Sequence, residues 1–135
     1  MSKLQKVAVI VWTIDPEGNR RFLLRHNKPF DGYEDEWTIT FGDIEGEESF
    51  EEAASRETRE EFGINEFKEI KNLNYKIEFE GKHGLTEAHF VSLRVKSLDA
   101  PITLNEESIG YDWMPIENVK ELMKHEDEKK AFDLI

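Results

Sequence analysis

The chain has 135 residues, no cysteine and a formal net charge of −12. This length corresponds to about one domain, which buries roughly two-thirds of the surface that the unfolded chain exposes. The composition excludes disulfides, thiolate metal sites and a cysteine nucleophile, and the acidic balance disfavours a surface that binds a nucleic-acid polymer.

The N-terminal stretch "MSKLQKVAVIVWTIDPEG" has lysines before a short apolar run, as a targeting segment would. Thr13 and Asp15 interrupt that run, and no small-residue cleavage site follows it. Nothing in the chain approaches the roughly 20 apolar residues needed to cross a bilayer. We therefore expect a soluble, cytoplasmic protein with no membrane partner.

The first half of the chain predicts three strands. Residues 6–14, "KVAVIVWTI", are apolar on both faces, which is typical of a central buried strand. The turn "DPEGN" leads to a second strand at residues 20–26. A polar loop with aromatic residues covers residues 27–36, and a short strand at residues 37–41 ends at Gly42.

A helix follows, and then a second group of strands and helices. Ser49 and Glu52 form a capping box that begins a helix running to about Phe62, and Gly63 ends it. The remaining elements are predicted from periodicity and turn residues: strands at 72–80 and 87–95 joined by "GKHG", a short strand within 99–114, and helices from about Pro115 to Lys124 and from Asp127. We expect one mixed α/β (α+β) domain over residues 1–135.

Negative charge is concentrated in the predicted central helix and the loop before it. Between Gly42 and Glu61 lie nine acidic residues and two arginines, so this stretch carries seven of the twelve excess negative charges. On a helix, Glu57, Glu60 and Glu61 occupy positions i, i+3 and i+4 of one face. Like charges at this spacing destabilise a helix by roughly 0.2–0.5 kcal/mol per pair, so the pattern indicates a bound divalent cation.

The full stretch, "GDIEGEESFEEAASRETREEFGI" at residues 42–64, resembles the signature of the Nudix hydrolases. That signature reads Gly, five residues, Glu, seven residues, Arg-Glu, an aliphatic residue, any residue, Glu-Glu, any residue, Gly and an aliphatic residue. The matching positions are Gly42, Glu48, Arg56, Glu57, Glu60, Glu61, Gly63 and Ile64. Thr58 replaces the usual aliphatic residue and is expected to face the sheet. The resemblance implies the Nudix fold, a mixed β-sheet sandwiched between helices.

The resemblance also implies a reaction and a set of metal ligands. Substrates of this family carry a diphosphate linked to another group X, and cleaving a phosphoanhydride requires neutralised phosphate oxygens and an activated water. Mg²⁺, or alternatively Mn²⁺, takes one or two carboxylates, which Glu57 and Glu61 supply one turn apart. The family's backbone carbonyl ligand is carried over to Gly42. Glu60 is then either a metal ligand or the group that orients the attacking water.

We call residues 42–64 the box, and the helix within it the box helix. Arg56 is the predicted catalytic arginine of this helix. It lies one turn before Glu60 and two turns after Glu48, so it can bridge carboxylates and fix their rotamers as a bidentate donor. The alternative is a surface ion pair worth under about 1 kcal/mol.

A second carboxylate site is predicted downstream in "LNEESIGYDWM". Nudix enzymes resembling dATP pyrophosphohydrolases and diadenosine tetraphosphate hydrolases often place a glutamate six residues before the tryptophan of a Tyr-x-Trp motif. Glu107 stands six residues before Trp113, with Tyr111 in register. By that resemblance Glu107 is an extra metal ligand or the general base. The alternative is that Glu106 and Glu107 are two solvated loop acids.

Substrate contacts are predicted from charge and aromatic residues near the box. Arg25 and Lys28 are candidates for binding phosphates, because an acidic protein needs local cations to accept a polyanion. Phe30, Tyr33 and Trp37 are candidates for stacking a base, with ordinary packing as the alternative for each. The expected partner is a small-molecule nucleotide or dinucleotide.

Residues beyond the signature bear on which activity within the family this chain has. Residues 79–82, "FEGK", lack the proline of ADP-ribose-cleaving members and the tyrosine of dinucleoside polyphosphate hydrolases. This favours a nucleoside triphosphate pyrophosphohydrolase that releases a nucleoside monophosphate and pyrophosphate. The alternatives are a dinucleoside polyphosphate hydrolase and a non-catalytic module that senses a nucleotide, and the intact box carboxylates disfavour the second.

Overall fold

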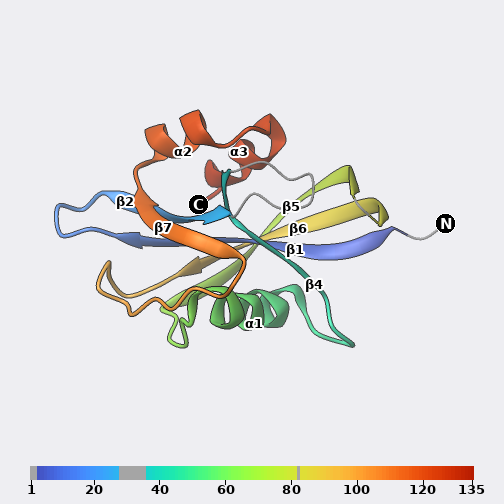
Figure 1. Cartoon of the computed structure of the whole chain (residues 1–135), viewed down its shortest axis with the longest axis horizontal. Coiled ribbons are helices and arrows are strands. Elements are labelled where there is room, and N and C mark those ends of the chain that lie inside the picture. The colour runs from blue at the N-terminus through green and yellow to red at the C-terminus, as the bar shows by residue number, and fades with distance from the viewer. Residues whose placement is uncertain (1–2, 28–35, 82) are drawn as a thin grey trace.

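The structure is a computed structural model that describes residues 3–27, 36–81 and 83–135. Within these residues seven strands form one sheet, and helices cover both of its faces (Figure 1). The strands are β1 (Leu4–Ile14), β2 (Arg20–Asn27), β3 (Trp37–Thr38), β4 (Thr40–Asp43), β5 (Glu69–Gly81), β6 (Gly84–Arg94) and β7 (Ser108–Met114). The helices are α1 (Phe50–Phe62), α2 (Ile116–Leu122) and α3 (Glu126–Phe132).

The sheet is mixed, with strand order β3-β2-β1-β6-β5, and β4 and β7 pair with β1 and β2. The β1 and β6 strands run parallel, whereas the other described pairs are antiparallel. Residues 7–11 of β1 are at most 1% exposed. This confirms the prediction of a central buried strand.

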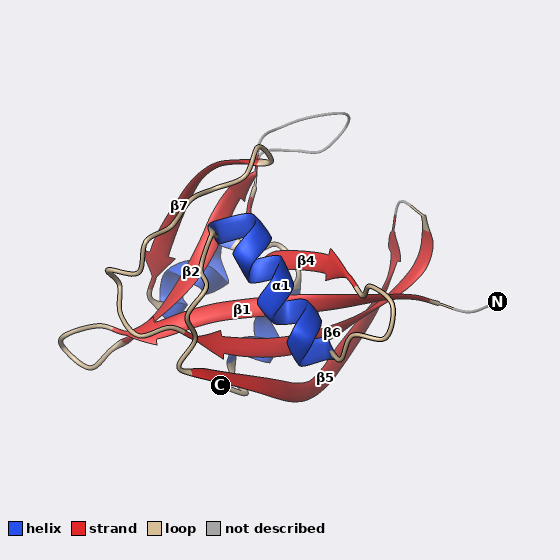
Figure 2. Cartoon of the chain, turned by 90° about the horizontal axis from the view of Figure 1, so that it is seen from below, coloured by secondary structure: helices blue, strands red, loops and turns tan. Residues whose placement is uncertain are grey.

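Two hydrophobic cores lie on opposite faces of β1. Alternate residues of a strand point to opposite faces, so Val7 and Val9 pack with Ala53 and Ala54 of α1. Ile10 belongs to the other core, which also contains residues of α2 and α3. Viewed from below, α1 lies across β1, β4 and β6 (Figure 2). The predicted arrangement of a mixed sheet between helices is confirmed.

The box helix begins and ends where the sequence predicts. The Ser49 side chain accepts a hydrogen bond from the Glu52 backbone, and the Glu52 side chain accepts one from the Ser49 backbone. At the other end Gly63 adopts the left-handed conformation with φ 67°, and its N–H donates to the carbonyl of Arg59. The side of the helix that packs on the sheet is buried and includes Thr58, as predicted: Ala53, Ala54, Thr58 and Phe62.

The prediction of a single strand over residues 37–41 is wrong. The structure breaks it at Ile39, which is 1% exposed, and the two pieces pair with different partners. The first piece, β3, extends β2, and the second, β4, pairs with β1. A chain that changes partner must interrupt its hydrogen-bond ladder, which local periodicity does not reveal.

The helix after Pro115 is shorter than predicted. It ends at Leu122, and Met123 is extended and 3% exposed, because its side chain belongs to the core under α2 and α3. None of the helices in the described residues combines the length and apolar character needed to span a membrane.

Candidate active site

The three glutamates at the end of α1 differ in burial. Glu57 and Glu61 are 8% and 7% exposed, whereas the side chain of Glu60 is 55% exposed. Glu57 and Glu61 lie one turn apart, and their side chains are on the buried side of the helix. Glu60 lies at the solvent edge of the same face. The structure therefore brings all three together, but only two of them are buried.

Strand β4 places Gly42 directly against Glu57. The strand pairs with β1, with Gly42 opposite Val7. A Cβ atom built on Gly42 would lie 2.1 Å from the Glu57 carboxyl carbon. Only glycine leaves room for this close approach of a carboxylate to the strand backbone. Two of the predicted metal-binding groups are thus in contact.

Arg56 binds most of the carboxylates around it. Its Nε and Nη2 donate to the two oxygens of Glu48 at 2.8 and 3.0 Å, and its Nη1 donates to Glu57 Oε1 at 2.8 Å. Nη2 also donates to the Asp43 carbonyl at 2.7 Å, and Nη1 lies 3.3 Å from Glu60. The guanidinium fork therefore ties the loop before α1 to the acidic face of the helix.

Burial dominates the electrostatics of the two inner carboxylates. It raises the pKa of Glu57 above the usual range, against the hydrogen bond from Arg56 that lowers it. Burial likewise raises the pKa of Glu61, and the neighbouring charges of Glu107 and Glu60 add to that increase. By contrast, the hydrogen bond from Arg56 lowers the pKa of Glu48. Burial thus disfavours the charged forms of Glu57 and Glu61, and a bound cation would favour them.

The loop before β7 reaches the same site. The Asn105 side-chain amide donates to Glu61 Oε2 at 2.9 Å, and its Oδ1 accepts from the backbone N–H of Glu107 at 3.1 Å. Glu107 is exposed, and its charge contributes to the raised pKa of Glu61. Sequence reasoning missed Asn105, because a single asparagine in a loop has no spacing that marks it.

Arg25 connects the acidic face to a neighbouring cavity. Its Nη1 lies 3.9 Å from Glu61 Oε2 and donates to Ser108 Oγ at 3.3 Å. Arg25 also lines a cavity of about 450 Å³ with Trp37, at the end of the sheet near α3. The structure therefore brings two of the predicted substrate contacts to one cavity. Lys28, Phe30 and Tyr33 lie outside the described residues.

The donor set suits a hard divalent cation. The two buried carboxylates are oxygen ligands of the kind that Mg²⁺ and Mn²⁺ take, and the Gly42 carbonyl would be a third. Across residues 3–27, 36–81 and 83–135, no three or more His, Cys, Asp or Glu side chains are arranged to hold a metal ion.

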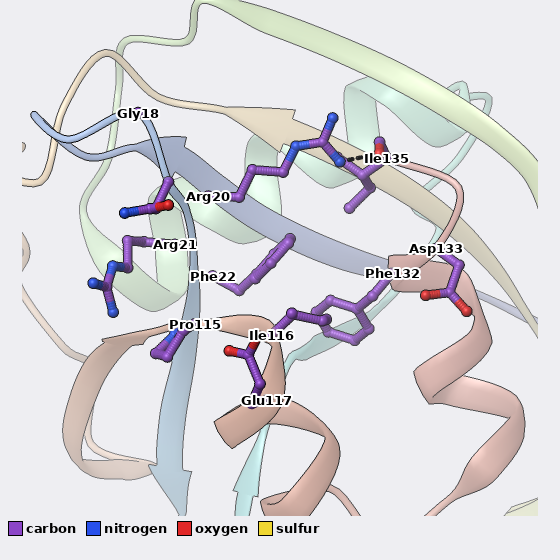
Figure 3. A pocket seen from close by; sticks show the side chains of 11 residues that line it. Gly18, Arg20, Arg21, Phe22, Pro115, Ile116, Glu117, Phe132, Asp133 and Ile135 are labelled. Atoms are coloured by element: carbon purple, nitrogen blue, oxygen red, sulfur yellow. Dashed lines mark hydrogen bonds between the residues drawn. The ribbon is translucent and has the colours of Figure 1, made fainter.

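A larger cavity, of about 640 Å³, lies away from this site (Figure 3). The turn after β1, the start of α2 and the end of α3 line it, and none of the predicted site residues is among them. Both arginines that line it have partners within the protein. Arg20 donates to the Ile135 carbonyl, and Arg21 Nε lies 3.0 Å from Asp15 Oδ2. Its lining shares no residue with that of the cavity beside Arg25 and includes none of the box glutamates, so it is separate from the acidic face.

Comparison with solved structures shows the same fold in proteins of low sequence identity. The Ap4A hydrolase of C. elegans is 17% identical with a TM-score of 0.79, and the alignment covers 97% of this chain and 93% of that one. The E. coli dihydroneopterin triphosphate pyrophosphohydrolase is 19% identical with a TM-score of 0.77, covering 98% and 96%. The NUDIX domain of Shewanella oneidensis NrtR, complexed with ADP ribose, is 16% identical with a TM-score of 0.75, covering 99% and 86%.

Sequence comparison identifies the family. No curated protein matches the chain. The family model described as the NUDIX domain matches residues 4–135, which is nearly the whole chain and includes the acidic face, Arg25 and the loop with Glu107. The chain therefore belongs to the NUDIX domain family and is a hydrolase of pyrophosphate bonds.

Proposed function

We propose that the protein is a metal-dependent nucleoside triphosphate pyrophosphohydrolase, which releases a nucleoside monophosphate and pyrophosphate. The observation that carries this proposal is the contact of the Glu57 carboxylate with Gly42, beside the buried Glu61. Arg25 adds a cation that lies between this acidic face and a cavity of nucleotide-binding size.

The metal would be held by the Gly42 carbonyl and the carboxylates of Glu57 and Glu61. When bound, Mg²⁺ or Mn²⁺ neutralises phosphate oxygens and activates a water molecule. Arg56 fixes the rotamers of Glu57 and Glu60 through its hydrogen bonds, so it acts by positioning carboxylates. Arg25 binds the phosphate chain of the substrate.

In the proposed reaction a water oxygen bonds to phosphorus, the bridging P–O bond breaks, and pyrophosphate leaves with the bond electrons. The water proton passes to an exposed carboxylate at the rim of the site, either Glu60 or Glu107. Both are candidates because their charges raise the pKa of the buried Glu61, which places them on the same side of the site.

Glu107→Gln is expected to lower kcat by at least about 10²-fold if its carboxylate accepts the proton. Glu106→Gln next to it is the matched control and should change the rate by no more than about 0.5 kcal/mol in activation free energy. Steady-state kinetics of both variants at saturating and limiting metal measure the contrast.

Two results would change the assignment of this loop. If both variants keep the wild-type kcat and metal dependence, the proton acceptor is Glu60. If only Glu106→Gln loses activity, the register taken from Trp113 is off by one residue.

The experiment that tests the proposed substrate class resolves products by chromatography after incubation with Mg²⁺. Nucleoside triphosphates, dinucleoside polyphosphates, ADP-ribose and nucleotide sugars are compared at equal concentration. The proposal expects the highest kcat/KM for a nucleoside triphosphate, with monophosphate and pyrophosphate as products. Preferred cleavage of a dinucleoside polyphosphate would favour the alternative activity, and tight nucleotide binding without turnover would contradict the proposal.

A further inference from the structure

The cavity beside Arg25 has one aromatic and one acidic side. Trp37 of β3, Phe41 of β4 and Phe79 of β5 contribute aromatic rings, and the Phe41 and Phe79 rings lie edge to face with centroids 6.3 Å apart. Trp37 stacks on His26 with centroids 4.6 Å apart. Such rings offer flat apolar faces on which a planar ligand can stack.

The cavity lies on the α3 side of β4, the acidic face of α1 lies on the other side, and Arg25 borders both. Phe41 lines the cavity, and the next residue, Gly42, touches Glu57. Arg25 contributes to both places, since it lines the cavity and lies 3.9 Å from Glu61. A ligand whose planar group lies in the cavity can therefore extend its phosphates toward Arg25 and the box glutamates.

Glu128 is the buried acid of this cavity. It lies on the packing side of α3, three and four residues before the buried Ala131 and Phe132, and it is 9% exposed. None of the residues that the structure describes donates a hydrogen bond to its carboxylate. Burial raises its pKa to about 7, with Asp127 and Glu36 adding to the increase and His125 opposing it.

Two polar atoms on other residues that line this cavity lack partners among the described residues. Asn27 Oδ1 and Arg25 Nε are both buried without a hydrogen bond, and both residues line the cavity. Buried polar groups in folded proteins are nearly always satisfied, and an unsatisfied carboxylate costs stability. Arg25 Nε and Asn27 Oδ1 are two such atoms on the lining of one cavity, where a polar ligand can supply the missing partners.

The acceptor character of the cavity selects among nucleobases. An ionised carboxylate accepts two parallel N–H bonds from donors that lie side by side. Guanine presents such a pair at N1–H and the 2-amino group, whereas adenine presents an acceptor beside its amino group. Above its pKa of about 7 Glu128 is ionised, and it would then oppose the adenine lone pair with its own, so the nucleotides are compared at a pH above that value.

We propose that this cavity binds the base of the nucleotide substrate and that Glu128 selects guanine over adenine by accepting its two adjacent N–H donors. The inference deepens the proposed function and rests on it for the placement of the phosphates. It assigns the specificity of the enzyme to a side chain on α3 that lies outside the box.

The test is calorimetric binding of GMP, IMP and AMP to the intact protein in the presence of EDTA. Hydrogen bonds to a charged group predict that GMP binds roughly 10- to 100-fold more tightly than AMP. IMP lacks the 2-amino group and should bind at least several-fold more weakly than GMP. Equal affinities for the three nucleotides would overturn the proposal without any mutation.

The matched variants are Glu128→Gln and Glu126→Gln on the same helix. Glu128→Gln should remove the preference for GMP, because the glutamine amide cannot accept two N–H bonds. Glu126, which is exposed and pairs with Lys129, should be replaceable without changing the preference. A GMP preference that persists in Glu128→Gln, with thermal melting showing a folded protein, would overturn the assignment.

The conditions separate this inference from the proposed function. Binding of monophosphates in EDTA needs neither metal nor turnover. A GMP preference that depends on Glu128, found in a protein that hydrolyses no nucleotide, would uphold the base site and contradict the proposed activity. Metal-dependent hydrolysis with equal kcat/KM for GTP and ATP would uphold the activity and contradict the base site.

Discussion

Glu57→Gln and Glu61→Gln are each expected to lower turnover by at least about 10²-fold, the usual scale for losing one electrostatic contact to the transition state. Glutamine keeps the shape of the side chain and removes the charge that the proposed metal needs. The fold should stand, because burial already disfavours the charged form of both side chains. Steady-state kinetics and thermal melting of the two variants measure both effects.

Glu51→Gln is the control for these variants, because it lies on the same helix away from Gly42 and Arg56. It should keep wild-type turnover, with stability changed by no more than about 0.5 kcal/mol. Wild-type rates in both Glu57→Gln and Glu61→Gln would remove the buried pair from the catalytic site. A loss of folding in either variant would mean that the charge is structural.

Gly42→Ala is expected to reduce turnover to a similar degree, for a different reason. The added Cβ would lie 2.1 Å from the carboxyl carbon of Glu57, so the two cannot both keep their positions. The end of a glutamate side chain moves more easily than a strand in a sheet, so the carboxylate is displaced and β4 stays paired with β1. Turnover should fall by about 10²-fold, and circular dichroism should show an unchanged fold.

Gly110→Ala provides the matched control for the added methyl group. Gly110 also lies in a strand, and a Cβ there would meet its nearest neighbour, His26, at 3.9 Å, which is ordinary contact. Its turnover should equal that of the wild type. If Gly42→Ala also retained full activity, the close approach of Glu57 to the strand would have no role in catalysis.

The box helix was predictable because its determinants are local. Ser49, Glu52 and Gly63 set its ends through contacts within a few residues, and the glutamate spacing set its acidic face. The contact between Gly42 and Glu57 was foreseen through a family resemblance, since nothing local brings a strand residue to a helix fifteen positions later. The roles of these residues remain proposals.

The cavity with Glu128 was not predictable from the sequence. In "HEDEKK" this glutamate is the last of three consecutive acidic residues. Such a charged run is typical of a solvated helix face. It is buried because α3 packs across β5, so its neighbours come from positions far away in the chain. Asn27 and Asn105 were missed for the same reason, since each acquires its surroundings only through tertiary packing.

The central claim is that the buried glutamate pair on α1 supports hydrolysis that depends on a divalent metal. The most direct measurement is nucleoside triphosphate turnover as a function of Mg²⁺ concentration, starting from protein treated with EDTA, in the wild type and in the Glu57→Gln, Glu61→Gln double variant. We expect no turnover in EDTA, a saturable recovery with Mg²⁺ in the wild type, and no recovery in the double variant. Full turnover in EDTA, or equal recovery in both proteins, would contradict it.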